Sequence, residues 1–292
     1  MIALWGRLPV IARAVLTGGL VAVAGTTPWA VLVSLNIKHG SAVPWAVPPT
    51  ALYLWLFWRW IRGAGWPRST AEARRVLCRA NPVSDDAWAM ALVAGLLGLV
   101  AVLLFQGVMG RLVTLPQQQD IDPSQYPIMT VALWVLMSAA VAGVTEEAAF
   151  RGYLQGPIER RHGPVLAILI TGLLFGLMHF THPEVTLVLL PFYLAVAAVY
   201  GMLAYLTNSI LPSVVLHGGG NVFAAFALFA GGRSEWQATA MPKPSIWETG
   251  ADASFWILVA LTLVVGAAAV WAYAALARVA KNTLPLDRRL IL

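Results

Sequence analysis

The stretch IMTVALWVLMSAAVAGVTEEAAFRGYLQ, residues 128–155, begins as a long apolar run and places charged side chains near its end. These are the adjacent carboxylates Glu146 and Glu147, followed by Arg151. An ionised side chain near the middle of a bilayer costs roughly 2.5–3.5 kcal/mol on insertion scales, and two neighbouring carboxylates also repel each other. The stretch therefore predicts a membrane-spanning helix whose charged residues are compensated by polar partners.

The rest of the chain shares this apolar character, with 59% hydrophobic and 11% charged residues among 292. Soluble domains carry about 25% charged residues, and a membrane-spanning helix needs about 20 residues. We therefore expect an all-α, polytopic membrane helix bundle of about eight transmembrane helices, forming a single integral membrane domain over residues 1–292. The predicted spans lie near residues 14–36, 45–62, 87–109, 128–149, 164–181, 185–206, 211–230 and 254–277.

The charge pattern argues for a membrane orientation rather than for a nucleic-acid partner. The net charge is +6, but the basic residues lie between apolar runs and not on one soluble face. A cytoplasmic N-terminus would place most of the 19 basic residues in the cytoplasm, as the positive-inside rule requires. We expect both termini to be cytoplasmic, and the lysine-poor, alanine-rich composition favours a bacterial cytoplasmic membrane. Cys78 is the only cysteine, which excludes an intramolecular disulfide and a multi-cysteine metal site.

Helix geometry separates the two glutamates. The i,i+4 spacing places Glu147 and Arg151 on one helix face, with the glutamate on the favourable N-terminal side. Glu146 is rotated from Glu147 by about 100° on an α-helix. We interpret Glu147 as a structural residue paired with Arg151, and we expect Glu146 to face a different partner. A carboxylate placed in this way suits a general base.

Two further polar clusters lie in neighbouring predicted spans. GLLFGLMHF, residues 172–180, places Phe175 and His179 one helical turn apart. LPSVVLHGGGNVF, residues 211–223, places His217 and Asn221 one turn apart. A buried imidazole is costly unless it is hydrogen-bonded. Both clusters therefore predict polar partners inside the bundle.

A distance argument links two of these clusters. Glu146 and His179 are equally far from the polar turn at residues 161–164. In an antiparallel helical hairpin both would lie about 24 Å from its apex, and so at the same depth. Taken singly, each polar residue fits a structural role as a helix contact or an ion pair, and the glycines after His217 fit close helix packing. Their joint occurrence indicates a functional site.

The three clusters together resemble the motifs of the CAAX-processing and bacteriocin-processing (CPBP) intramembrane proteases, the group that contains the Ras-converting prenyl endopeptidase. The sequence from Glu146 to Arg151 resembles its EExxxR motif. Phe175 to His179 resembles FxxxH, and His217 to Asn221 resembles HxxxN. The motifs occur in family order and on separate predicted helices. The similar core covers roughly residues 125–230, whereas the other spans resemble the family only in being apolar.

The resemblance implies an intramembrane endopeptidase that hydrolyses a peptide bond of a membrane-tethered protein or peptide. It implies that Glu146 is the general base and holds the nucleophilic water together with His179. It also implies that His217 and Asn221 stabilise the oxyanion. The residues implied to support this architecture are Glu147, Arg151 and Phe175.

Metal dependence and two other functions are left open. The family is described both as metalloproteases and as glutamate proteases, and the candidate zinc ligands are Glu146, His179 and His217. We expect the metal-free mechanism without a cofactor, because Glu147 is committed to Arg151, and zinc is the alternative. The other functions are a non-catalytic membrane immunity or binding protein, and a proton-coupled transporter that uses the carboxylates as a relay.

Overall fold

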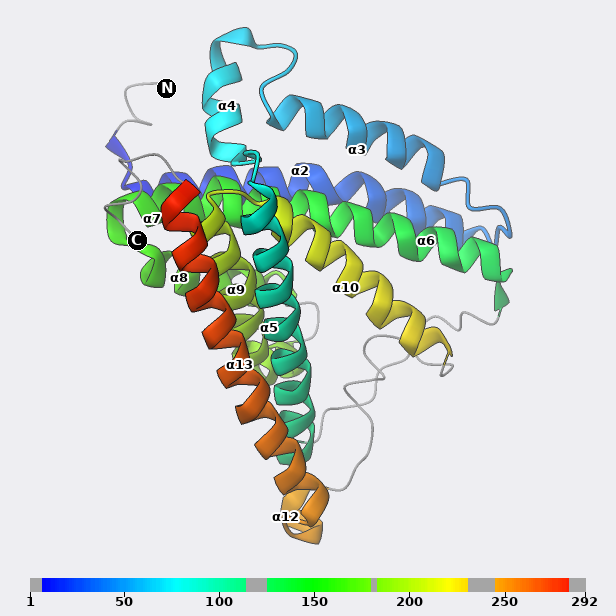
Figure 1. Cartoon of the computed structure of the whole chain (residues 1–292). Coiled ribbons are helices and arrows are strands. Elements are labelled where there is room, and N and C mark those ends of the chain that lie inside the picture. The colour runs from blue at the N-terminus through cyan, green and yellow to red at the C-terminus, as the bar shows by residue number, and fades with distance from the viewer. Residues whose placement is uncertain (1–6, 114–124, 180–182, 231–244, 284–292) are drawn as a thin grey trace. The chain divides into compact units, whose positions relative to one another are not determined.

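The computed structural model describes residues 7–113, 125–179, 183–230 and 245–283 (Figure 1). Within these ranges every regular element is a helix, so the all-α class is confirmed. The chain divides into two compact units. Unit 1 comprises Met1–Pro82, Asp122–Ala167 and Asn208–Ala227, and unit 2 comprises Val83–Ile121, Ile168–Thr207 and Leu228–Leu292. The single membrane domain and the catalytic core at 125–230 stay predictions.

Each of the eight apolar runs contains a helix. Unit 1 contains α2 (Val10–Lys38), α3 (Val47–Ile61), η1 (Arg68–Thr70), α4 (Ala71–Cys78), α6 (Ile128–Val141), η3 (Ala142–Leu154), α7 (Gln155–His162) and most of α10 (Leu211–Ala230). Unit 2 contains α5 (Asp85–Leu112), most of α8 (Pro164–Leu177), α9 (Pro183–Thr207), α12 (Ile246–Thr249) and α13 (Ala253–Thr283).

Five of the described helices are long and apolar enough to cross a membrane. They are Val10–Lys38, Asp85–Leu112, Ile128–His162, Leu187–Thr207 and Ala253–Lys281. Pro164–Leu177 is apolar but shorter. The chain is therefore an integral membrane protein, whereas the count of eight spans and the orientation of the termini stay predictions.

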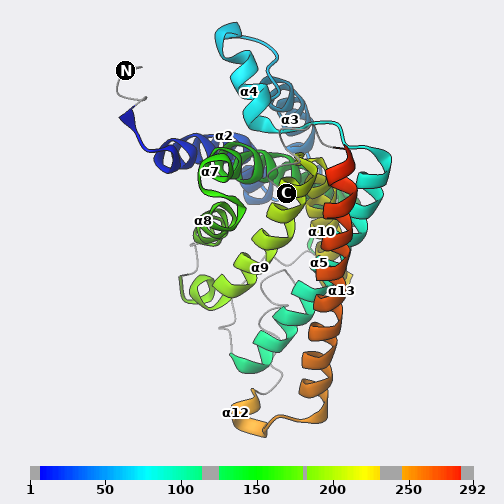
Figure 2. The ribbon, with the colours of Figure 1, turned by 60° about the vertical axis from the view of Figure 1, so that its left-hand side comes forward.

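The fourth apolar run continues well beyond its predicted end at residue 149. Ile128–His162 forms one continuous 35-residue helical segment, in which η3 is a 13-residue π-helix. A π-helix forms i→i+5 hydrogen bonds and often marks a functional site. Helix α2 lies beside α6 and η3 (Figures 1 and 2). Two glycines permit this approach, because a Cβ at Gly25 would lie 2.6 Å from Thr145 Cβ and one at Gly18 would lie 2.8 Å from Leu154 Cβ.

Helix α4 lies in the arginine-rich segment between the second and third predicted spans, where no helix was expected. Its C-terminal end packs on η3, since a Cβ at Gly152 would lie 2.7 Å from the Leu77 carbonyl oxygen and 2.8 Å from that of Cys78. Cys78 is fully buried there. Burial raises the pKa of its thiol to about 12, so Cys78 is a packing residue and not a nucleophile.

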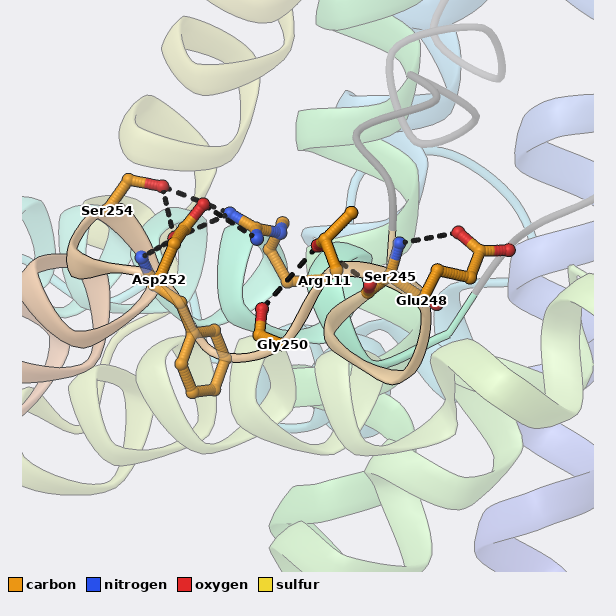
Figure 3. A network of polar contacts seen from close by, with 8 residues as sticks. Arg111, Ser245, Glu248, Gly250, Asp252 and Ser254 are labelled. Carbon is orange, nitrogen blue, oxygen red and sulfur yellow. Dashed lines mark hydrogen bonds and ion pairs between the residues drawn. The ribbon is translucent and has the colours of Figure 1, made fainter.

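In unit 2, α5 and α13 lie side by side (Figures 1 and 2). Polar contacts join the C-terminal end of α5 to the start of α13 (Figure 3). The Asp252 carboxylate accepts a hydrogen bond from the Phe255 N–H at 2.9 Å, which caps α13, and pairs with Arg111 at 3.2 Å. The Phe255 N–H, the Ser254 hydroxyl and Arg111 together lower the pKa of Asp252 to about 2.

Candidate active site

Close backbone packing brings α10 against η3 in unit 1. A Cβ at Gly143 would lie 2.9 Å from the Val214 carbonyl oxygen and 3.1 Å from the Gly218 nitrogen. A Cβ at Gly218 would lie 3.3 Å from the Ala139 carbonyl oxygen. Small residues allow membrane helices to approach in this way. The approach places His217, next to Gly218, against the turn of η3 that follows Gly143.

His217 lies between the two adjacent glutamates. Its Nδ1 is 2.8 Å from Glu147 Oε1, and its Nε2 is 3.9 Å from Glu146 Oε2. A carboxylate accepts hydrogen bonds and does not donate them, so Nδ1 carries a proton and donates it to Glu147. This bond fixes the orientation of the ring and directs Nε2 towards Glu146.

Glu147 also pairs with Arg151. Arg151 Nη1 is 3.4 Å from Glu147 Oε1, and both side chains have 0% exposure. Removal of one partner from such a buried pair costs about 3–5 kcal/mol, because the other charge is left uncompensated. The i,i+4 pair expected from the sequence is thus present, but Glu147 has a second task, the orientation of His217.

Glu146 differs from Glu147 in its access to ligands. Its side chain is 15% exposed, against 0% for Glu147. The two carboxylates both approach His217, although helix geometry predicted that Glu146 would point elsewhere. The reason is the π-helix: each of its turns contains more residues than an α-helical turn, so consecutive side chains are separated by less than 100°. The 3.9 Å separation is too long for a direct hydrogen bond and suits a water molecule shared by both groups.

His179 belongs to unit 2 and follows the end of α8 at Leu177, whereas the predicted span continued to residue 181. The Phe175 carbonyl oxygen is 2.9 Å from His179 Nδ1. A carbonyl only accepts, so Nδ1 carries the proton and Nε2 is the acceptor nitrogen of the neutral ring. The imidazole also stacks on Tyr193, with ring centroids 4.6 Å apart and an interplanar angle of 21°. Two neighbouring residues thus hold the His179 ring in place.

The sequence did not identify Tyr193. Its aromatic character was visible, but spacing along one chain does not reveal which residue of α9 lies against the turn after α8.

Asn221 lies one turn beyond His217 on α10 and is partly buried. The structure therefore brings Glu146, Glu147, Arg151 and His217 together. The place of His179 beside Glu146, like the oxyanion role of Asn221, stays a prediction.

The zinc alternative can be compared with the donors in unit 1. The Glu146 carboxylate and the Nε2 atom of His217 suit zinc, and the Glu147 contact at Nδ1 resembles the carboxylate that orients a metal-bound histidine. A catalytic zinc site uses three protein ligands. Among the described residues, no group of three or more His, Cys, Asp or Glu side chains is arranged to hold a metal ion. We therefore derive no catalytic step from a metal.

Residues 128–223 match a family model described as type II CAAX prenyl endopeptidase Rce1-like. The match runs from the first residue of α6 into α10 and contains all three motifs. The match supports membership of this core in the CPBP family. Proteins of the CPBP family are generally proteases, so the match supports a peptidase at this coarse level. Comparison with curated proteins and with solved structures gave no match.

The CPBP match begins and ends close to the predicted core of residues 125–230. It leaves α2 to α5 and α13 outside. Glu146, Glu147 and His217, which lie together in unit 1, all fall within it. The family comparison and the geometry thus identify the same part of the chain.

Proposed function

We propose that the protein is an intramembrane endopeptidase that hydrolyses a peptide bond of a membrane-tethered protein or peptide through a water activated by Glu146. The observation that carries the proposal is the position of His217 between a fully buried Glu147 and a partly exposed Glu146. One carboxylate holds the imidazole, and the other is 15% exposed and within reach of water. A mere helix contact would need only the first of them.

The proposed reaction starts with a water molecule bound to Glu146. The Glu146 carboxylate takes a proton from the water as its oxygen forms a bond to the carbonyl carbon of the scissile peptide. The carbonyl oxygen becomes an oxyanion, which the Nε2–H of a doubly protonated His217 and the Asn221 amide stabilise by hydrogen bonds. Each such donor contributes roughly 2.7–4 kcal/mol in proteases. The C–N bond then breaks, and the protonated Glu146 returns its proton to the leaving amine.

The surrounding residues have supporting roles in this proposal. Glu147 holds His217 through Nδ1 and balances the charge of an imidazolium that carries protons on both nitrogens. Arg151 balances Glu147 when the ring is neutral. His179 Nε2 is the acceptor that would hold the water on its second side, with Phe175 and Tyr193 fixing the ring.

The test is a comparison of membrane proteomes from cells that produce the wild-type protein or the Glu146→Gln variant. We expect peptide termini that depend on the wild-type protein to disappear with Glu146→Gln, and the uncleaved precursor to accumulate. The variant keeps the shape of the side chain, so the amount of folded protein should not change. Glu72→Gln is the matched control, because this glutamate lies on α4 and is 71% exposed.

The outcome also separates the alternatives. An unchanged set of termini with Glu146→Gln would contradict hydrolysis. If the proteome stayed constant while resistance to a toxic peptide was lost, the protein would be a binding or immunity protein instead. Uptake of a solute driven by a proton gradient in proteoliposomes would indicate transport.

A further inference from the structure

A polar pocket lies in unit 1, between the C-terminal end of α3, helix α4 and the segment that follows α4. Its volume is about 320 Å³. The charged and polar wall is formed by Arg59, Arg62, Arg75 and Asn81, and the apolar wall includes Trp58 and Pro82. None of these residues belongs to the three motifs, and the proposed peptidase mechanism uses none of them.

The pocket carries an excess of positive charge. Three arginines line it, and among its described lining residues none is acidic. Arg75 pairs with Glu72 at 2.6 Å, which balances one charge and leaves two. Arg59 and Arg62 instead lie over tryptophan rings, 4.8 Å and 5.4 Å from the ring centroids. Among the ion pairs of the described residues, none involves Arg59 or Arg62.

Two uncompensated guanidinium groups on one concave surface suit an anion with several oxygen atoms. A guanidinium binds phosphate oxygens in a bidentate manner, and stacking on tryptophan limits its freedom before the ligand arrives. The apolar wall suits a ligand that carries carbon beside its charge. A phosphate ester has both properties.

The surroundings of the pocket indicate where such a ligand would come from. Three tryptophans at this end of α3 and in the next turn are exposed, Trp55 at 52%, Trp60 at 40% and Trp66 at 84%. Exposed tryptophans with neighbouring arginines are typical of the membrane–water interface. Basic pockets at this level bind phospholipid head groups.

We propose that this pocket is a binding site for a phosphate group, held by Arg59 and Arg62 against Trp58. Two sources supply that chemistry, an anionic phospholipid head group and free phosphate, and the tryptophans favour the lipid. The site stands apart from the proposed peptidase activity, so it can be tested whether or not the protein is a protease.

The experiment is native mass spectrometry of the purified full-length protein with added phosphatidylglycerol or phosphatidylcholine of the same acyl chains. We expect preferential binding of phosphatidylglycerol, and roughly 30-fold weaker binding by the Arg59→Gln/Arg62→Gln double variant. The matched control is Arg7→Gln/Arg68→Gln, which removes the same charge from two exposed arginines outside the pocket. Because Arg59 and Arg62 are both exposed, the double variant should keep the thermal unfolding midpoint of the wild-type protein.

A second arm titrates inorganic phosphate in the absence of added lipid. Phosphate binding that is lost in Arg59→Gln/Arg62→Gln, with equal binding of the two lipids by all variants, would support the site with free phosphate as its source. If neither phosphatidylglycerol nor phosphate bound the double variant less well than the control variant, the proposal would be overturned. Equal weakening in both double variants would also overturn it, since the effect would then come from net charge alone.

Discussion

The neighbours Glu146 and Glu147 have the same side chain in different surroundings. Glu147 is sealed between Arg151 and His217, and its contacts leave it no access to a substrate. Glu146 reaches the same imidazole from the other ring nitrogen and keeps 15% of its side chain exposed. A general base must contact the proton that it removes, so of these two glutamates Glu146 is the one that we propose for this role.

Glu147→Gln should therefore lower stability as well as activity. Glutamine can still accept the hydrogen bond from His217 Nδ1, but the buried Arg151 loses its counter-charge, which costs about 3–5 kcal/mol. The thermal unfolding midpoint in detergent should fall in Glu147→Gln and stay unchanged in Glu146→Gln. Neutralising Arg151 as well, in Glu147→Gln/Arg151→Gln, should recover part of the loss. An unchanged midpoint in Glu147→Gln would argue against a stabilising ion pair.

At the scale of residues, the sequence predicted which residues belong to the candidate site better than it predicted the contacts between them. The cost of buried charge singled out Glu147 and Arg151, because a charged residue inside an apolar run can be recognised from the linear sequence alone. The bond from His217 to Glu147 joins residues 70 positions apart. No periodicity reports such a pairing, and the assumption of α-helical geometry directed Glu146 away from His217.

At the scale of helices, the site depends on how closely α10 approaches η3. Gly143 and Gly218 leave their backbones in direct contact, and backbone atoms cannot move aside as a flexible side chain would. The loop after α4 fixes the start of α10 as well. Arg79 forms a buried pair with Glu159 of α7 at 2.8 Å, and its carbonyl oxygen accepts a hydrogen bond from the Ile210 N–H at 3.0 Å. The positions of both helices are thus set by contacts outside the three motifs.

Gly143→Ala should reduce catalysis by displacing α10. The new methyl group would lie 2.9 Å from the Val214 carbonyl oxygen, so the helix must shift and carry His217 away from the glutamates. A misplacement of about 1 Å can cost about 100-fold in rate. We expect a loss of this size in the cleavage rate of the precursor identified with Glu146→Gln.

The matched control for this variant is Gly219→Ala, on α10, where a Cβ would meet no atom within 4 Å. It should keep full activity, since an added methyl group in open space moves no backbone. Equal activity of Gly143→Ala and the control would show that close packing of these helices is not required.

Two elements, the π-helix η3 and helix α4, could not have been predicted from hydropathy. The π-helix has the same kind of apolar residues as an α-helix, so hydropathy does not distinguish the two. Helix α4 was hidden because Arg74 and Arg75 give it the composition of a loop. The structure buries Arg74 and places its guanidinium 4.5 Å from the centroid of the Trp60 ring, a contact that makes a basic residue part of a core.

The contacts between α5 and α13 predict a response to acid. The folded-state pKa of Asp252 is lowered to about 2 from 3.8, so its contribution is present above pH 3.8 and is lost as pH falls through 2. Asp252→Asn keeps a capping oxygen but not the charge. Its unfolding midpoint should lie below that of the wild-type protein near pH 6, and the difference should shrink towards pH 2.

Arg111, which pairs with Asp252, provides the control. In an Arg111→Gln background the change Asp252→Asn should matter less, because the guanidinium that pairs with the charge is gone (Figure 3). A difference between wild type and Asp252→Asn that did not vary with pH would contradict the proposed origin of the stabilisation.

At the scale of the whole molecule, the three motifs are divided between the two units. EExxxR and HxxxN belong to unit 1, whereas His179 belongs to unit 2, where Phe175 and Tyr193 hold its ring. The sequence predicted the matched depth of Glu146 and His179 from helix rise alone. That argument predicts the depth of the two residues along the membrane normal. It says nothing about their positions within the membrane plane, so it could not predict whether Glu146 and His179 lie close together.

The final prediction concerns this second histidine and zinc together. If His179 Nε2 holds the nucleophilic water directly, His179→Ala should abolish cleavage as completely as Glu146→Gln does, while the protein keeps its unfolding midpoint. Because the described residues of unit 1 bring only two suitable zinc donors together, Glu146 and His217, we expect cleavage by the wild-type protein to persist after dialysis against 1,10-phenanthroline. Dialysis against the non-chelating isomer 1,7-phenanthroline controls for effects of the compound on the bilayer. Activity that was lost only with the chelator and restored by added zinc would replace the metal-free mechanism with one in which His179 is a ligand. Full activity of His179→Ala would instead remove this residue from the site and leave catalysis to unit 1.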